Sequence, residues 1–237
     1  MIFGSGTSSG AVQDFAAARH EMVARQIRSR GITTARVLDA MASVPRHEFV
    51  PAAAQASAYS DEALPIGGGQ TISQPFMVAA MTDALQLSGT ERVLEIGGGC
   101  GYQAAVLSLL AQAVVVVELQ PALANASRER LARLGYGNVC VEEGDGSLGW
   151  PARAPYDAIL VSAAAPAIPP PLIEQLSDDG RLVIPVGGSD QQNLLRIVKR
   201  AGGLAQESLY ACRFVPLLGR HGWPASVADA VRGSSAR

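Results

Sequence analysis

The sequence predicts one α/β domain built on a doubly wound, mostly parallel sheet. Two observations support this fold class: short apolar segments alternate with helical segments after Gly89, and 48% of the 237 residues are hydrophobic. Alternating strands and helices are typical of a parallel sheet covered by helices on both faces. A chain of this length and apolar content can also bury a core of the required size.

Seven segments of the chain are predicted as strands. The first five alternate with helical segments and are expected to be parallel. The last two flank a turn at Gly202 and Gly203 and are expected to form an antiparallel hairpin at one edge of the sheet. The predicted strands cover residues 92–96, 114–118, 139–142, 157–162, 181–186, 193–199 and 209–215. The helices between them are expected over residues 102–111, 122–134 and 171–176.

The part of the chain before this sheet is predicted as helices and one loop. Residues 15–30 show a helical pattern, and Thr34 is expected to cap a second helix that ends before Pro45. Residues 64–75, which read LPIGGGQTISQP, are predicted as a loop that leads into a further apolar helix.

We expect a single domain between two tails. Residues 1–13 are rich in glycine and serine and are predicted to be a flexible tail. Residues 14–237 form the domain, in which residues 14–88 supply the helical part and the loop, and residues 89–218 supply the sheet. Residues 219–237 are expected to be a C-terminal tail.

Composition excludes several classes of function. The formal net charge is −2 and no Lys/Arg-rich run occurs, so we expect no binding to nucleic acid through its phosphates. No signal-peptide pattern and no apolar stretch of about 18 residues occurs, which predicts a cytoplasmic protein that does not enter membranes. Cys100, Cys140 and Cys212 form no CxxC pattern, so neither a disulfide framework nor a metal site is predicted.

The strongest local signal is residues 93–103, which read VLEIGGGCGYQ. An apolar strand enters a glycine-rich turn here, and glycine allows both a tight turn and the close approach of a ligand to the backbone. Taken alone, a tight strand-to-helix connection explains the turn equally well. The spacing of Glu95, Gly97, Gly99 and Gly101 is E-x-G-x-G-x-G, which differs from the G-x-G-x-x-G of a dinucleotide site.

Acidic residues stand at the carboxyl ends of three successive predicted strands. Glu95 can hold the methionine ammonium of S-adenosylmethionine, and Glu118 stands where a carboxylate accepts hydrogen bonds from both ribose hydroxyls. Asp145 and Gly146 follow the third strand, near the expected position of the adenine amine. Each acid alone is explained as a solvated strand end, but parallel strands bring all three to one crevice. The sequence therefore predicts S-adenosylmethionine as the cofactor.

In these and other motifs, the sequence resembles the protein-L-isoaspartate O-methyltransferases from about residue 22 to residue 218. The most specific block of the resemblance is GQTISQP at residues 69–75. The other blocks are VPR at 44–46, ALPIG at 63–67, the glycine turn, GDG at 144–146, APYDAI at 154–159, GRLVIPVG at 180–187 and RFVPL at 213–217. Gly98 and Cys100 depart from the family, which usually has Thr and Ser there, but both residues are small, so cofactor binding is expected to survive.

The resemblance implies a Rossmann-like methyltransferase fold with a seven-stranded sheet and a defined reaction. The enzymes transfer a methyl group to the free α-carboxylate of L-isoaspartyl residues, which starts repair through a succinimide. Ser73 is implied as the active-site residue, although an N-cap for the helix near Pro75 is an alternative role. A peptide groove is implied near residues 213–216, for which a plain edge strand is an equally good account. The remaining implied contacts are Gln70, Thr71 and Ile72 with the cofactor, and Arg213, Val215 and Pro216 with the peptide.

This reaction agrees with the absence of an acid–base motif. An α-carboxylate has a pKa of about 3.5 and is already ionised at neutral pH, so the transfer needs alignment and not a general base. Isoaspartyl proteins and peptides are the expected partners, and a monomer is expected. Two alternatives stay open: a carboxyl methyltransferase with another acceptor, such as a modified ribosomal peptide, and a non-catalytic S-adenosylmethionine-binding module. Residues 161–164 read VSAA, which lacks the motif of amine-methylating nucleic-acid enzymes.

Overall fold

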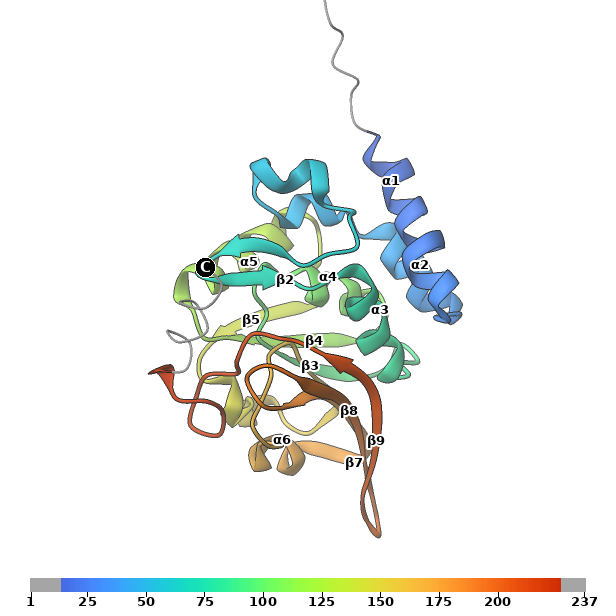
Figure 1. The fold of residues 1–237 in the computed structure, drawn as a ribbon. Helices are drawn as coiled ribbons and strands as arrows, with labels where there is room; N and C mark the ends of the chain where they lie inside the picture. The colour runs from blue at the N-terminus through green and yellow to red at the C-terminus, as the bar shows by residue number, and fades with distance from the viewer. Residues whose placement is uncertain (1–13, 227–237) are drawn as a thin grey trace, which may run out of the picture.

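In the computed structural model, which describes residues 14–226, seven strands form one sheet (Figure 1). Their spatial order is β5 (Val139–Glu143), β4 (Ala113–Glu118), β3 (Arg92–Ile96), β6 (Tyr156–Val161), β7 (Leu176–Gly187), β8 (Gln192–Arg200) and β9 (Gly203–Cys212). The strands from β5 to β7 pair in parallel, whereas β8 is antiparallel to both of its neighbours. This topology confirms the predicted mostly parallel sheet with an antiparallel hairpin at its edge.

The two faces of the sheet belong to two hydrophobic cores. Successive side chains of a strand point to opposite faces, so the five interior strands, β4, β3, β6, β7 and β8, contribute to both cores. On β4, Val114 and Val116 lie in the first core, whereas Val115 and Val117 lie in the second. The sheet is therefore buried on both faces, as the near-continuous apolar sequence of its strands predicts.

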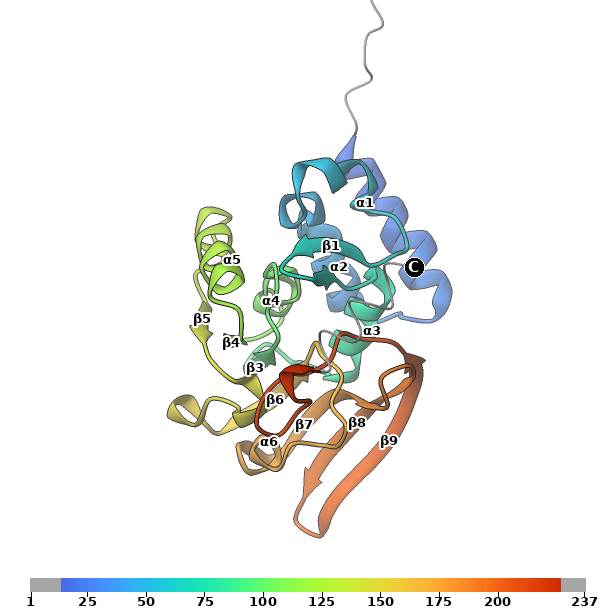
Figure 2. The ribbon, with the colours of Figure 1, turned by 60° about the vertical axis from the view of Figure 1, so that its left-hand side comes forward.

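Most helices lie on one face of the sheet (Figure 2). Five of them contribute buried residues to the first core: α1 (Phe15–Met22), α2 (Ala35–Ser43), α3 (Pro75–Ala84), α4 (Tyr102–Ser108) and α5 (Pro121–Arg133). The second core is covered by the short helix α6 (Pro170–Glu174) and by loops that carry Trp150, Ala163 and Leu217. The three helices predicted between the strands are thereby confirmed as α4, α5 and α6.

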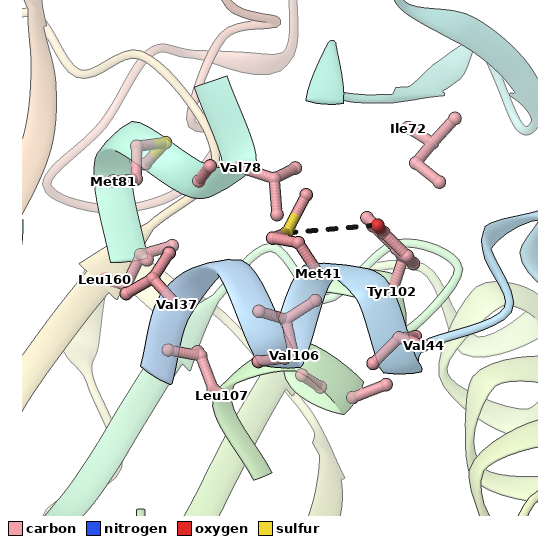
Figure 3. Close-up of a cluster of buried hydrophobic side chains, with 14 of the residues drawn as sticks. Val37, Met41, Val44, Ile72, Val78, Met81, Tyr102, Val106, Leu107 and Leu160 are labelled. Atoms are coloured by element: carbon pink, nitrogen blue, oxygen red, sulfur yellow. Dashed lines mark hydrogen bonds between the residues drawn. The ribbon is translucent and has the colours of Figure 1, made fainter. Parts of the chain in front are cut away.

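Helices α2, α3 and α4 meet in the first core (Figure 3). Met41 of α2 points toward Tyr102 of α4, whose hydroxyl lies 4.0 Å from the Met41 Sδ. Val78 of α3 and Val106 of α4 lie beside this pair. The N-terminal helices are thereby packed onto the sheet and share its core.

Short helical turns connect several of these elements. The helix predicted over residues 15–30 is helical throughout, but only its first part, α1, is an α-helix. Gly31 ends this segment with a φ of 98°, which glycine adopts without a Cβ clash. The turns are a π turn, η1 (Val23–Ile27), and the 3-10 turns η2 (Arg28–Arg30), η3 (Arg46–Phe49), η4 (Ala52–Ser57), η5 (Gly146–Leu148) and η6 (Pro151–Arg153).

Thr34 stands directly before α2, as predicted, but its side chain does not cap the helix. No capping hydrogen bond is formed by the Thr34 hydroxyl, so that prediction was wrong. The Thr34 carbonyl oxygen accepts hydrogen bonds from the backbone N–H groups of Val37 (3.0 Å) and Leu38 (3.1 Å). The first turn of α2 therefore begins through backbone contacts alone.

The segment predicted as a plain loop over residues 64–75 contains a small hairpin. β1 (Leu64–Gly67) and β2 (Gln70–Ile72) pair antiparallel. The turn between them needs left-handed backbone at three consecutive glycines, whose φ values are 93°, 61° and 72° for Gly67, Gly68 and Gly69. The plain-loop prediction was wrong because the glycine run connects two strands that are too short to show a periodic pattern.

The last strand begins earlier than predicted. The prediction placed it at residues 209–215, whereas β9 spans Gly203–Cys212 and pairs with β8 directly after the turn, with Gly203 opposite Arg200. Residues 203–208 lie exposed at the edge of the sheet, so they carry no apolar signal. Residues 213–215 have already left the sheet.

The predicted tails lie largely outside the described residues, namely residues 1–13 and 227–237. The division of the chain into a central domain and two tails therefore stays a prediction. Among residues 14–226, no helix is long and apolar enough to cross a membrane.

Glu91 joins the loop after α3 to the start of β3 and is only 6% exposed. Its carboxylate accepts hydrogen bonds from the Ser88 N–H (2.8 Å), the Ser88 hydroxyl (2.8 Å), the Gly89 N–H (2.8 Å) and the Thr90 N–H (3.1 Å). Burial opposes ionisation of this group, but the hydrogen bonds from Ser88 and Gly89 outweigh burial and lower the pKa of Glu91 from 4.5 to about 2.

We predict that Glu91→Gln lowers the free energy of unfolding by about 2–3 kcal/mol at neutral pH. Because the pKa of Glu91 is depressed in the folded state, its contribution is complete above pH 4.5 and is lost as the pH falls toward about 2. Urea unfolding at several pH values measures this difference. Glu129→Gln, at an exposed position of α5, is the control. A difference between wild type and Glu91→Gln that does not change with pH would contradict the account.

Candidate active site

A cavity of about 840 Å³ opens at the carboxyl ends of β3, β4 and β6. In an open α/β sheet, ligands bind at this end of the strands. Most of the cavity wall is made by Gln70, Thr71, Ile72, Ser73, Val78, Glu95, Ile96, Gly97, Gly98, Gly99, Cys100, Tyr102, Gln103, Val117, Glu118, Gln120, Gly146, Ser162, Ala163, Val215, Pro216 and Leu217.

The predicted glycine turn forms one wall of this cavity. Gly97, Gly98 and Gly99 line it, whereas Gly101 begins α4 in the left-handed conformation and packs against α5. A Cβ built on Gly98 would lie 2.3 Å from Cγ1 of Val116. A side chain at position 98 would therefore require the Val116 side chain to move, whereas glycine fits without this change.

Glu95 ends β3 and is fully buried beside the cavity. Neither carboxyl oxygen has a hydrogen-bond partner among residues 14–226. Burial, and then the nearby charge of Glu118, raise the pKa of Glu95 well above 4.5. An unpaired buried carboxyl group is costly, and a cation that lies against it would remove this cost. The position fits the ammonium group of S-adenosylmethionine.

Glu118 ends β4 on the same side of the sheet. Its Oε2 accepts a hydrogen bond from the Gly99 N–H (2.8 Å), and its Oε1 accepts one from the Gln120 N–H (2.9 Å). A carboxylate oxygen has two lone pairs, so each oxygen can accept a further hydrogen bond from a ligand. This arrangement both fixes the glycine turn and fits the ribose hydroxyls of the cofactor.

The hairpin before α3 forms the opposite wall. Its predicted site residues Gln70, Thr71, Ile72 and Ser73 all line the cavity. Gln74, not Ser73, occupies the N-cap position of α3, so the alternative role of Ser73 as a helix cap was wrong. The Ser73 side chain therefore does not serve as the N-cap of α3.

Asp145, the predicted contact of the adenine amine, does not line the cavity. Its Oδ1 accepts hydrogen bonds from the Ser147 N–H (2.9 Å) and the Ser147 hydroxyl (2.7 Å), and its Oδ2 accepts one from the Arg220 N–H (2.8 Å). The lining of the cavity includes Gly146 but not Asp145. The carboxylate thus secures the chain at Arg220, and a direct contact of Asp145 with the cofactor stays a prediction.

Residues 213–217 run beside the segment that follows β6 and are not part of an edge strand. Ala164 donates its N–H to the Val215 carbonyl (2.8 Å) and accepts a hydrogen bond from the Leu217 N–H (2.8 Å). Val215 and Pro216 line the main cavity, whereas Arg213 lines a smaller neighbouring cavity of about 300 Å³ that shares Pro216. The predicted role of this segment in holding a peptide stays a prediction.

Several residues of the site were missed in the sequence. Leu119 and Gln120 directly follow Glu118, so their position after the strand was an available signal. Gln120 Nε2 donates to the Gly68 carbonyl (3.1 Å) and so links the hairpin to the end of β4. Tyr102 and Gln103 belong to the helix after the glycine turn, where only tertiary packing decides which side chains face the cavity. No group of three His, Cys, Asp or Glu suited to a metal ion occurs in residues 14–226.

A seven-stranded sheet of this topology, with a glycine turn and two buried acids at one cavity, defines the class of S-adenosylmethionine-dependent methyltransferases. A solved structure of a putative Plasmodium falciparum protein-L-isoaspartate O-methyltransferase in complex with S-adenosyl-L-homocysteine has the same fold. Its TM-score is 0.72 at 24% identity, over 85% of this chain and 99% of that chain.

Sequence comparison assigns the particular family. The family described as protein-L-isoaspartate(D-aspartate) O-methyltransferase matches residues 17–222. A protein-L-isoaspartate O-methyltransferase of Roseiflexus castenholzii is 57% identical over 210 residues, which cover 89% of this chain and 96% of the relative. A solved protein-L-isoaspartate O-methyltransferase has a TM-score of 0.79 at 30% identity, over 86% of this chain and 67% of that chain. The chain belongs to this family, which confirms the predicted fold and the cofactor S-adenosylmethionine.

We predict that Glu118→Ala weakens the binding of S-adenosylhomocysteine by about 1.5–3 kcal/mol, because charge-assisted hydrogen bonds are lost. Calorimetric titration measures the change. Glu143→Ala is the matched control, since Glu143 is the register partner of Glu118 on β5 but is exposed. Equal affinities for Glu118→Ala and wild type would place the ribose elsewhere.

Proposed function

We propose that this protein methylates the free α-carboxylate of L-isoaspartyl residues in damaged proteins, and that Ser73 orients this carboxylate. Ser73 lines the same cavity as Glu95 and Glu118, which supports the proposal most directly. Within residues 14–226, the Ser73 hydroxyl has no hydrogen-bond partner, so it can donate to a substrate. Ser73 follows the hairpin, whereas the two acids lie at the strand ends, which suits an acceptor on one side of the cavity and a cofactor on the other.

The reaction needs no general base, so the two carboxyl groups of the lining, Glu95 and Glu118, are left for the cofactor. S-adenosylmethionine, when bound, supplies a methyl group on a sulfonium leaving group. Burial raises the pKa of the Cys100 thiol and raises the pKa of Tyr102 to about 12, so both groups stay neutral at neutral pH. The acceptor carboxylate, with a pKa of about 3.5, is already ionised. The residues of the site therefore have to align and shield the reactants.

Apolar residues line much of the remaining wall, including Ile72, Val78 and Leu217. Methyl transfer from a sulfonium to a carboxylate neutralises both charges, so the transition state is less polar than the reactants. A wall that excludes water therefore favours the transition state over the separated ions. The apolar lining therefore suits a methyl transfer to a carboxylate.

Family membership makes isoaspartyl-containing proteins the substrate class. We further propose that the protein acts as a monomer in the cytoplasm and binds neither nucleic acid nor membranes. The net charge of −2 without a basic run supports the lack of affinity for nucleic acid. Gly98 and Cys100, the two departures from the family, both line the cavity and are both small, which supports retained cofactor binding.

The test compares labelled methyl transfer to an isoaspartyl peptide and to its normal aspartyl twin. Isomerisation frees the α-carboxylate, which lies one methylene closer to the backbone than the side-chain carboxylate of the aspartyl twin. A misplacement of about 1 Å can cost about a hundredfold in rate, so we expect methylation of the isoaspartyl peptide alone. Equal methylation of the twins would contradict the repair function, and cofactor binding without transfer would indicate a non-catalytic module.

The same assay tests Ser73. We expect Ser73→Ala to lower turnover about 10- to 100-fold with unchanged affinity for S-adenosylhomocysteine, and Ser73→Thr to be milder. Ser60→Ala changes a half-buried serine outside the cavity and is the control. Wild-type turnover of Ser73→Ala at saturating peptide would remove Ser73 from the reaction.

A further inference from the structure

Arg46 at the start of η3 is fully buried, with a relative exposure of 0%. Its Nε donates a hydrogen bond to the Ala58 carbonyl (2.7 Å), and its Nη2 donates one to the Ser73 carbonyl (2.8 Å). One guanidinium thus ties together the residue after η4 and the residue that follows the hairpin. Its Nη1 has no hydrogen-bond partner in the described chain.

This buried charge has no carboxylate to balance it. Within residues 14–226, no Asp or Glu lies within ion-pair distance of Arg46. Burial lowers the pKa of Arg46, and the two groups that act most strongly against this effect, Tyr102 and Cys100, are uncharged at neutral pH. The Tyr102 ring, with its centroid 4.9 Å from the Arg46 Cζ, gives a weak cation–π contact.

Stability alone is a poor explanation for such a residue. Burying an unpaired cation is costly, and a neutral side chain of similar size fills the same space without that cost. The two carbonyl groups that Arg46 holds are backbone acceptors, which a neutral amide can also satisfy in part. A role in the reaction explains the charge and its position together.

The position of Arg46 is directly behind the acceptor side of the cavity. Ser73 and Tyr102, which Arg46 contacts, both line the cavity, whereas Arg46 itself does not. A hydrogen bond to the Ser73 carbonyl fixes the peptide plane after Ser73 and so restricts the direction of its side chain. Gln74 Nε2 donates to the Asp61 carbonyl (3.0 Å) and holds the next residue of the same segment.

We propose that Arg46 is a positioning residue for methyl transfer, which holds the Ser73 peptide group so that the Ser73 hydroxyl meets the acceptor carboxylate in one direction. The guanidinium also places a positive charge behind the wall that receives this anion. The inference rests on the proposed role of Ser73, through which Arg46 acts.

A double-mutant cycle between Arg46→Gln and Ser73→Ala tests this inference in the full-length enzyme. We expect Arg46→Gln to lower kcat for an isoaspartyl peptide about 10- to 100-fold, with the KM for S-adenosylmethionine within about twofold of wild type. In the Ser73→Ala background, the same change should lower kcat by less than about twofold, because residues that act as a unit are not additive. A purely structural role would lower kcat equally in both backgrounds.

Two further variants keep the result interpretable. Arg46→Lys preserves the charge but reaches only one of the two carbonyls, so it should show an intermediate loss of kcat. If Arg46→Gln does not fold, Arg46→Lys takes its place in the cycle. Gln26→Ala removes a comparable hydrogen bond, from Nε2 to the Tyr59 carbonyl (2.8 Å), one residue from Ala58 and away from Ser73. Gln26→Ala should lower the melting temperature without changing kcat.

The outcomes separate the inference from the function on which it rests. Multiplicative losses in the cycle, with Ser73→Ala impaired on its own, would overturn the role of Arg46 and leave that of Ser73 intact. Wild-type turnover of Ser73→Ala would overturn both roles. An equal loss of kcat in Gln26→Ala and Arg46→Gln would also overturn the inference, since loosening the N-terminal segment would then explain the effect.

Discussion

The carboxyl group of Glu95 is buried near the end of β3, an interior strand of the sheet, and no residue in the described chain donates a hydrogen bond to it. The neighbouring strands and the glycine turn keep the Glu95 carboxyl group buried and without a partner. β4 and β6 flank β3 in parallel, so three strand ends open at one edge, and the glycine turn carries the backbone past Glu95 without a side chain that could cover it. Glu118 then fixes the turn through the Gly99 N–H. A cation from outside the chain would complete this arrangement, and the ammonium of S-adenosylmethionine has the required charge.

The charges of the site are distributed to suit a cation and an anion. Two acids lie at the ends of adjacent strands, whereas the guanidinium of Arg46 lies behind the opposite wall, at the Ser73 carbonyl. Each reactant can therefore lie against a wall of opposite charge: the positively charged cofactor against the two acids, and the negatively charged acceptor against the side of Arg46. Because the acceptor is ionised before it binds, the chain can perform the reaction without a titrating base near neutral pH. The residues of the site then contribute by aligning the two reactants and by excluding water.

The parts of this account that the sequence predicted depend on local patterns. The β4 strand reads as six successive apolar or acidic residues. The positions of Glu95 and Glu118 follow from strand ends, which parallel pairing brings together. The missed parts depend on contacts between distant segments. The carboxylate of Asp145 binds Arg220, which is 75 residues away, and Arg46 binds the carbonyl of Ser73, which is 27 residues away. The exposed first half of β9 has no apolar period because its outer edge faces solvent. The proposed role of Ser73 came from the family resemblance, because no spacing rule in the sequence points to this residue.

The central claim is that Glu95 receives the cationic group of the cofactor, and proton linkage tests it most directly. Burial raises the pKa of Glu95 well above 4.5 in the free protein, whereas a bound ammonium favours the ionised form. Titration of S-adenosylhomocysteine into the protein, in two buffers of different ionisation enthalpy, measures the protons released on binding. The account predicts that wild type releases more protons than Glu95→Gln, and that its affinity rises with pH above 4.5 until the pKa of the free protein is reached. Identical proton release and identical affinity for wild type and Glu95→Gln across this range would contradict it.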